Sequence, residues 1–383
     1  MDLTRARLAG TVAFAHNGFV LGFWIVNIPG ILDRTDTSKA QLGVLLLLLG
    51  GSALVGMQAA GALIDRVGSR RVLGVAAGAM SLLVVGPAAS TSTAALAVTL
   101  VLLGLANGAV DVAQNAHAAD VERHYGRPIM TSFHAFYSAG GLLVSVVGGL
   151  LIAADVDLPV SASAVAVVGV LVVLWVVRGM LPPEPVQHDE TPVGRPPWSR
   201  HVALLGLLAF VLLLAEGVAY DWSTVHLHET LDASKAVAAY AFGAFSVTMT
   251  IVRLVADRVV AAIGPGAYVR WAALLGALGL AGAALAPTVP LGIAAWALFG
   301  IGLAGCVPQF FTAAAAVDPR TAGVTMARVT GCGYLGLLAG PSVIGLLTGW
   351  VPLTTAFVVP LVGCVLASAL APRALRPVER ASS

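Results

Sequence analysis

Long apolar segments separated by short polar or Pro/Gly-containing breaks recur along the 383-residue chain. Each segment has about 18 or more residues with almost no charge, enough for an α-helix to cross a hydrocarbon core roughly 30 Å thick. The pattern therefore predicts twelve membrane-spanning helices. Their expected spans are 9–31, 40–63, 72–90, 94–120, 129–154, 158–181, 201–226, 235–256, 267–287, 290–316, 321–348 and 352–371.

Composition supports an all-α integral membrane protein, because 58% of the residues are hydrophobic and only 10% are charged, against about 25% charged in soluble domains. The net charge is +2 and no basic run alternates with aromatic residues, so nucleic acid is not an expected partner. The three cysteines lie in apolar segments and form no disulfide or zinc pattern. Neither a catalytic triad nor a His-Glu-x-x-His or phosphate-binding motif is found. The sequence therefore indicates a protein that is not an enzyme and needs no cofactor.

The basic residues define an orientation. Only Arg34, Lys39 and Lys235 of the 21 Lys and Arg residues fall on loops of one side of the predicted membrane. Cytoplasmic loops carry the excess of Lys and Arg, so the other side, which holds both termini, is predicted to be the cytoplasm.

The chain is predicted to consist of two related halves. A proline-rich polar linker, residues 182–200, separates six expected helices in 1–181 from six in 201–383. The tripeptide Asp65-Arg66-Val67 recurs as Asp257-Arg258-Val259, an offset of 192 residues (257 − 65). Gly140 and Gly336 align at an offset of 196 (336 − 140), as do Gly149 and Gly345. Repeated halves are typical of transporters whose site lies at the repeat interface.

The stretch GALIDRVGSRR, residues 61–71, resembles the signature loop of the major facilitator superfamily. Six residues match its pattern, and Ser69 stands where a basic residue is common; the matches are Gly61, Leu63, Asp65, Arg66, Gly68 and Arg70. Gly68 permits a tight turn. The resemblance implies that Asp65 helps to hold the halves together on the cytoplasmic side in the outward-facing state. The alternative is that the arginines only set the topology.

The second copy of this motif is less regular. Six residues separate Asp257 from Gly264, where the first copy has two between Asp65 and Gly68. A gating role for Asp257 and Arg258 is therefore a weaker expectation.

Three longer stretches resemble the bacterial branch that contains the fucose permeases; they are GLANGAVDVAQNAHAADVERHYGRPIMTSFHAFYSAGG, EGVAYDWSTVHL and GYLGLLAGPSVIGLL. The resemblance implies a bacterial inner-membrane protein that moves sugars or similar small polar solutes by proton symport. The fucose permeases are implied to use a carboxylate in the first helix, where this chain has only His16, Asn17 and Asn27 as polar candidates. Drug antiporters usually carry an Arg in the fourth helix, and this chain has none there before Arg123 at its cytoplasmic end. Proton-coupled efflux is therefore an alternative that fits less well than symport.

Polar residues inside apolar spans are the candidate site, because ionisable groups in a bilayer usually face the bundle interior or a wet cavity. Asn107, Asp111 and Asn115 recur at every fourth position and share one helix face. Amides bind hydroxyl groups as donor and acceptor, and a carboxylate removed from water binds a proton more readily. Asp111 is therefore predicted to couple protons, and the two amides to bind solute. The alternative is a packing network between helices.

The segment 201–226 offers a second acid, Glu216, with Tyr220 one turn later on the same face. Glu216 is predicted to bind a proton and Tyr220 to bind solute. Trp222 is expected to be an interfacial anchor, and Asp221 to lie near the outer surface.

Other polar residues complete the expected site. His134 is predicted to relay protons or, alternatively, to hydrogen-bond to the loop before its helix. Asn17, Gln309 and Tyr334 are expected to contact solute, and Arg328 is expected to reach the cytoplasmic surface.

No Lys or Arg is expected near the midplane, which favours a neutral polyhydroxylated or a cationic solute. The sequence thus predicts a monomeric secondary transporter in a lipid bilayer, with a small solute and a proton as its partners.

Overall fold

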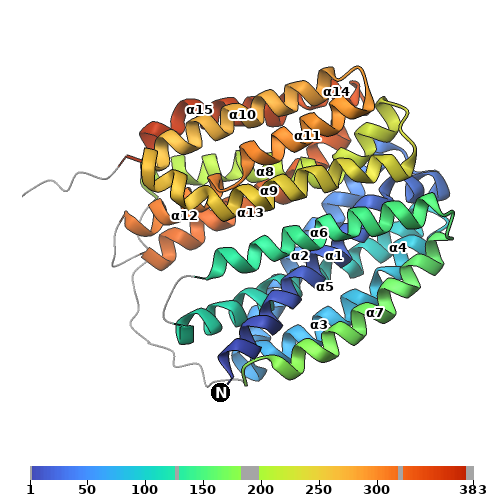
Figure 1. Cartoon of the computed structure of the whole chain (residues 1–383), viewed down its shortest axis with the longest axis horizontal. Helices are drawn as coiled ribbons and strands as arrows, with labels where there is room; N and C mark the ends of the chain where they lie inside the picture. The colour runs from blue at the N-terminus through green and yellow to red at the C-terminus, as the bar shows by residue number, and fades with distance from the viewer. Residues whose placement is uncertain (1, 126–128, 183–197, 318–321, 377–383) are drawn as a thin grey trace, which may run out of the picture.

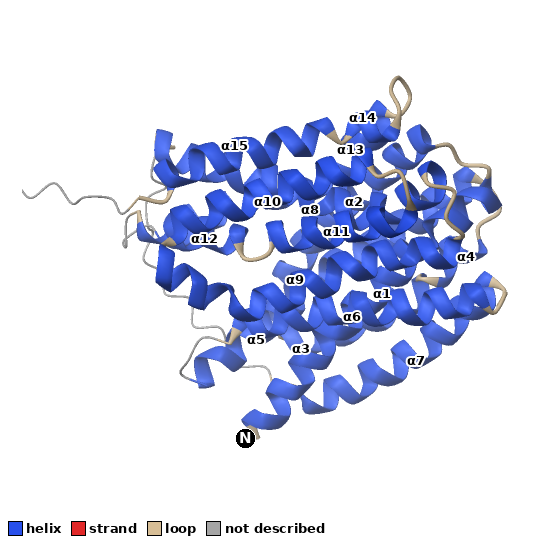
Figure 2. Cartoon of the chain, turned by 45° about the horizontal axis from the view of Figure 1, so that its top comes forward, coloured by secondary structure: helices blue, strands red, loops and turns tan. Residues whose placement is uncertain are grey.

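A computed structural model describes residues 2–125, 129–182, 198–317 and 322–376, with only the backbone described at 65, 131, 315, 322–324 and 327. Every regular element in these ranges is an α-helix (Figure 2). The first half comprises α1 (Leu3–Thr35), α2 (Lys39–Val67), α3 (Ser69–Leu83), α4 (Val85–Ala89), α5 (Thr93–Tyr125), α6 (Met130–Ala153) and α7 (Leu158–Gly179). The second comprises α8 (Arg200–Thr230), α9 (Lys235–Ile263), α10 (Pro265–Leu285), α11 (Val289–Leu303), α12 (Cys306–Ala316), α13 (Ala322–Leu347), α14 (Leu353–Ala356) and α15 (Val358–Ala374).

Twelve segments of the described chain are long and apolar enough to cross a membrane, which confirms the predicted number. Three of them consist of two helices each, where the sequence analysis predicted one: α3 with α4, α11 with α12, and α14 with α15. α1 also begins earlier than predicted and α5 ends later, because amphipathic ends extend the helices beyond their apolar cores. The expected linker lies mostly outside the described residues.

Prolines explain the three breaks. α3 and α14 end four residues before Pro87 and Pro360, at Leu83 and Ala356, and α11 ends at Leu303, five residues before Pro308. Proline has no N–H for the carbonyl four residues earlier, and its ring clashes with that carbonyl. A freed carbonyl in a membrane needs another donor, and the Tyr268 hydroxyl supplies one to the Ala304 oxygen at 2.7 Å.

Pro29, by contrast, lies within a continuous helix, α1. The carbonyl that it frees belongs to Ile25, and the Thr224 hydroxyl of α8 donates to this oxygen at 3.2 Å. A proline in the first half thus creates a hydrogen bond to the second half.

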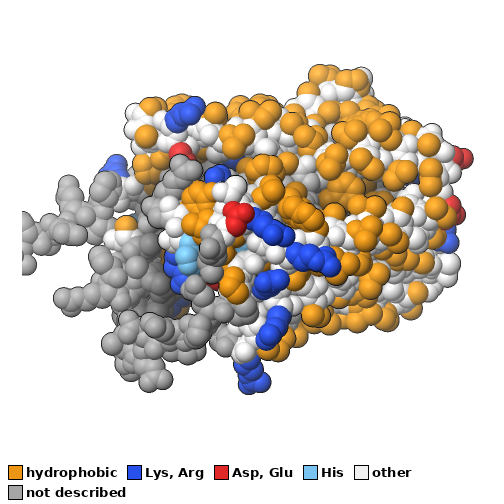
Figure 3. Space-filling model, turned by 60° about the horizontal axis from the view of Figure 1, so that its bottom comes forward, with side chains coloured by type: hydrophobic (Ala, Val, Ile, Leu, Met, Phe, Trp, Pro, Cys, Tyr) orange, Lys and Arg blue, Asp and Glu red, His pale blue; other side chains and the backbone are white. Residues whose placement is uncertain are grey.

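The two halves form adjacent bundles, with α1–α7 in one and α8–α15 in the other (Figure 1). α1 begins and α15 ends at the same end of the molecule (Figure 1). In Figure 3 most visible Lys and Arg side chains lie between the upper left and the lower centre of the view, and hydrophobic side chains cover much of the remaining surface. Large apolar residues such as Leu285 and Trp350 are more than 80% exposed, as expected of side chains that face lipid.

A single sequence offset relates α2 of the first half to α9 of the second. α2 and α9 each contain 29 residues and begin 196 positions apart, at Lys39 and Lys235. The glycines that end them, Gly68 and Gly264, share a φ of 84°, a value that favours glycine. At this offset the residue equivalent to Asp65 is Ala261, not Asp257. The offset of 192 inferred from the Asp-Arg-Val tripeptides is therefore wrong by four residues, about one helical turn.

The halves contact each other through α1 with α8, α2 with α13, and α6 with α9. A methyl group on Gly43, near the start of α2, would overlap the backbone of Gly345, near the end of α13. Gly149, near the end of α6, likewise lies against Ala236 at the start of α9. These contacts lie at the end opposite α1's first residue, which we call the outer end, after the side that the Lys and Arg distribution predicts.

Small residues also set the spacing within each half. Gly104 and Gly108 of α5 lie against the carbonyl groups of Leu49 and Ala53 of α2. Glycines spaced by four bring two helix backbones close together in a membrane.

We expect Gly108→Val to lower the free energy of unfolding by about 1–3 kcal/mol, the usual effect of overpacking, because its side chain would overlap the Ala53 carbonyl. Thermal unfolding of the purified protein in detergent measures the change. Gly51→Ala on the facing helix is the control, since a methyl group there meets no atom within 4 Å. Equal thermal midpoints for the two variants would contradict this account of α2–α5 packing.

Candidate functional site

Asp111 lies midway along α5 among neutral hydrogen-bond donors. The Asn115 side-chain amide donates to the Asp111 Oδ1 at 3.2 Å and to its backbone oxygen at 2.8 Å, as their spacing predicts. Gln114 of α5 and Tyr334 of α13 also interact with the carboxylate through their polar side chains. The described residues place no Lys or Arg in an ion pair with Asp111. Its carboxylate is thus bound from both halves of the protein without a compensating charge.

Glu216 of α8 lies in a second group. The Tyr220 hydroxyl donates to its Oε1 at 2.6 Å, and the Arg253 guanidinium of α9 donates to the same oxygen at 3.0 Å. The Glu216 side chain is only 7% exposed and that of Arg253 18%. Arg253 also donates to the Ser138 hydroxyl of α6 at 3.2 Å, across the two halves.

Two tyrosines connect these groups. Tyr137 of α6 interacts electrostatically with Asp111, Glu216 and Arg253. Tyr334 interacts with Asp111, Tyr137 and Glu216. We call the combined set the polar centre; it contains Asp111, Asn115, Tyr137, Ser138, Glu216, Tyr220, Arg253 and Tyr334. Its members come from both halves, so movement of one half against the other changes their contacts.

The chemistry of the polar centre suits hydroxylated solutes and protons. Amide and phenol groups both donate and accept hydrogen bonds, and a carboxylate can take up a proton. Arg253 compensates the charge of Glu216, whereas the contacts of Asp111 are all neutral. The two acids are therefore not equivalent.

Arg253 was missed by the sequence analysis, and the expectation of no Lys or Arg in the interior is wrong. The residue lies a turn before the exposed Asp257, which led to its assignment to the cytoplasmic end. Its long side chain reaches from there to Glu216. The signal that could have identified it is an isolated Arg with apolar neighbours on both sides, Val252 and Leu254.

Trp222 is not an interfacial anchor. Its side chain is fully buried, and its indole Nε1 donates to the Pro341 backbone oxygen of α13 at 2.9 Å. The ring also packs on Gly345. Because α8 packs against α13, Trp222 does not face lipid. Its place near the outer end of its helix could not show this, because the covering residues belong to another helix.

The remaining predicted residues lie around these groups. Asn107 is half-buried one turn before Asp111. Asn17 of α1 is 2% exposed, and its Oδ1 has no hydrogen-bond partner among the described residues. The Gln309 amide donates to Gly305 of its own helix segment at 3.3 Å. The contact of Asn107, Asn17 and Gln309 with solute therefore stays a prediction.

His134 packs its ring edge-on against Phe14 of α1, with centroids 5.1 Å apart.

The backbone N–H groups of Ile129 and Met130, before and at the start of α6, donate to Glu122, at 2.6 and 2.7 Å. The acid in the preceding helix thus satisfies the amides that begin α6.

The predicted gate lies around the α2–α3 turn. Gly68 makes the turn, Arg66 is exposed, and the half-buried Arg70 interacts electrostatically with His117 of α5. A methyl group on Gly61 would meet no atom within 4 Å, so close packing does not require glycine there. The Asp65 side chain lies outside the described part of the chain.

In the second half, Asp257 and Arg258 are both exposed near the end of α9. Arg328 places its guanidinium 5.2 Å from the ring centroid of Trp198, just before α8. A cation over an indole ring is a favourable arrangement, and it fixes Arg328 beside the start of the second half.

A polar centre between two bundles of six membrane spans each, with an apolar exterior, is the arrangement of a membrane transport protein. The chain belongs to the Major Facilitator Superfamily, whose sequence profile matches residues 10–220 and 204–383.

Individual proteins agree with this assignment. An uncharacterized transporter, y4wD, of Sinorhizobium fredii is 34% identical over 367 residues, which cover 94% of this chain and 95% of that protein. The solved D-xylose-proton symporter has a TM-score of 0.77 at 14% identity and covers 99% of each chain. The E. coli fucose:proton symporter has a TM-score of 0.66 at 15% identity, covering 96% of this chain and 98% of that one. At these identities the two symporters show a shared fold.

Proposed function

We propose that the protein is a secondary active transporter that moves a small polar solute, sugar-like or otherwise neutral, by alternating access and proton symport. The observation that carries this proposal is the polar centre, where Asp111 accepts a hydrogen bond from Asn115 and interacts with the neutral Tyr334 of the other half. A carboxylate without a compensating cation can gain and lose a proton as its surroundings change.

The two acids support different roles in this proposal. Asp111 carries the proton, because protonation removes its uncompensated charge. Glu216 positions Arg253, which contacts the first half through Ser138. Asn107, Asn115, Tyr220 and Tyr334 supply donors and acceptors to the solute, with Asn17, Gln309 and His134 as further candidates. The fold shared with the solved D-xylose-proton symporter is compatible with this solute class and does not identify the solute.

The proposed setting is the cytoplasmic membrane of a bacterium, with both termini in the cytoplasm and the protein acting as a monomer. The segment around the α2–α3 turn, with Gly61, Asp65, Arg66, Gly68 and Arg70, is proposed to control closure of the cytoplasmic end. Asp257 and Arg258 lie close to the equivalent loop after α9, where they are proposed to assist.

The test is proton movement in proteoliposomes that contain an internal pH dye. Neutral sugars, polyols, amino acids and cationic drugs are added one at a time. Internal acidification on addition of one sugar or polyol supports symport and identifies the solute class. If only lipophilic cations dissipate an imposed pH gradient, the protein is an efflux antiporter, and the symport proposal is wrong. Empty liposomes and liposomes with heat-inactivated protein are the controls.

A further inference from the structure

Two ion pairs join the halves at the outer end. Lys39 at the start of α2 contacts Glu229 near the end of α8, with Nζ and Oε2 3.1 Å apart. Lys235 at the start of α9 contacts Asp33 near the end of α1, with Nζ and Oδ2 2.5 Å apart. Each pair thus connects one residue of the first half to one of the second. We call them the outer ion pairs.

The internal repeat relates the outer ion pairs to each other. Lys235 lies 196 positions after Lys39, and Glu229 lies 196 positions after Asp33. This is the offset that relates α2 to α9 and the turn at Gly68 to that at Gly264. Each half therefore contributes one lysine and one acid from equivalent positions, and the two contacts are reciprocal.

Local structure fixes both lysines in place. Each is the first residue of its helix, directly after an N-cap serine whose side chain accepts a backbone N–H: Ser38 from Gln41 and Ser234 from Val237. The chain reaches each serine through an aspartate in the left-handed conformation, Asp36 or Asp232. Both lysine side chains thus start from the same backbone geometry, which repeats in the two halves.

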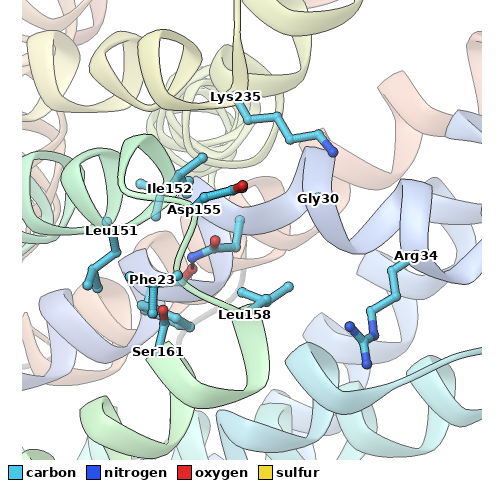
Figure 4. A pocket seen from close by; sticks show the side chains of 13 residues that line it. Phe23, Gly30, Arg34, Leu151, Ile152, Asp155, Leu158, Ser161 and Lys235 are labelled. Carbon is cyan, nitrogen blue, oxygen red and sulfur yellow. Dashed lines mark hydrogen bonds between the residues drawn. The ribbon is translucent and has the colours of Figure 1, made fainter.

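Water reaches both pairs. The side chains of Lys39 and Glu229 are 34% and 29% exposed, and those of Lys235 and Asp33 are 34% and 54% exposed. Lys39 and Glu229 border a surface hollow of about 470 Å³, and Lys235 borders another of about 210 Å³. Figure 4 shows the Lys235 side chain extending over Gly30 of α1, beside Asp155. Exposed pairs are individually weak, so the outer ion pairs can break and re-form while the protein works.

Close packing lies directly beneath the pairs. Gly43 meets Gly345 next to Lys39, and Gly149 meets Ala236 next to Lys235. One turn deeper, the buried Ser145 of α6 lies against Gly243 of α9. Separation of the halves at the outer end would expose Ser145 and would require both pairs to break.

We propose that the outer ion pairs act as a reciprocal gate that holds the outer end closed and opens when both break. The gate assumes the alternating access of the proposed function, but its opening can be measured without any solute or proton gradient. The two proposals can therefore fail separately.

The test uses a variant in which Cys306, Cys332 and Cys364 are replaced by Ala, with Ser145→Cys as the reporter. A membrane-impermeant maleimide is applied outside intact cells. Lys39→Ala with Lys235→Ala is expected to raise the labelling rate about two- to tenfold, the shift that the loss of two exposed ion pairs would give. Thr91→Cys on the exposed loop before α5 reports reagent access, and its rate should not change.

Charge exchange separates the ion pairs from general effects of the substitutions. Lys39→Glu with Glu229→Lys, combined with Lys235→Glu and Asp33→Lys, reverses both pairs and is expected to restore the original labelling rate. Arg34→Ala removes a positive charge from the same surface, at the hollow beside Lys235, and is expected to leave the rate unchanged. The proposal is overturned if the alanine variant labels at the original rate, if charge exchange fails to restore it, or if Arg34→Ala accelerates labelling equally.

Discussion

Arg253→Gln is expected to lower the free energy of unfolding by about 3–5 kcal/mol, because removing one partner leaves the other charge buried and unpaired. Glu216 would keep the Tyr220 hydroxyl but lose the guanidinium that contacts the same oxygen. The contact with Ser138 of the other half would be lost as well. Thermal unfolding of the purified protein in detergent measures the effect.

Two variants make this prediction specific. Glu216→Gln combined with Arg253→Gln removes both charges and is expected to recover most of the lost stability. Arg258→Gln, five residues further along α9 at an exposed position, is expected to change stability by no more than about 0.5 kcal/mol. If Arg253→Gln unfolds at the temperature of the unmodified protein, the ion pair is not what stabilises this part of the polar centre.

Asp111→Asn is expected to abolish uphill, proton-coupled accumulation of the solute, because an amide does not take up and release a proton near neutral pH. Asparagine keeps the shape of the side chain and can still accept from Asn115 and Tyr334, but it cannot bind a proton as a carboxylate does. Exchange of labelled solute across the membrane without a gradient should therefore persist while uphill accumulation is lost. Both are measured in proteoliposomes with the solute that the pH assay identifies.

Asp155→Asn is the matched control for this prediction. Asp155 is exposed in the loop after α6 and has a positive φ of 57°, a conformation that asparagine also tolerates. Uptake of solute by the Asp155→Asn variant should equal that of the unmodified protein. Full uphill accumulation by Asp111→Asn would exclude Asp111 as the proton-coupling residue.

The sequence by itself determined the number of membrane spans, the division into halves and the pairs within one helix. Apolar length sets a span in lipid, and the helical period places residue i beside i+4. Asp111 with Asn115 and Glu216 with Tyr220 follow from that period alone, and their hydrogen bonds are present. The proline positions did not by themselves determine where three spans break, because Pro87, Pro308 and Pro360 follow breaks whereas Pro29 lies within the continuous α1.

Only the tertiary structure decided which side chains meet between helices. Arg253 reaches Glu216 from 37 residues away, and Trp222 bonds to Pro341 across 119; no periodicity relates such positions. The register of the repeat was decided there too, because Gly68 and Gly264 share one backbone turn although the nearby Asp-Arg-Val tripeptides are four residues out of step. The outer ion pairs had the same origin. Lys39 and Glu229 become neighbours only when the two bundles pack together, since the contact depends on how the bundles are placed and not on the local sequence of either.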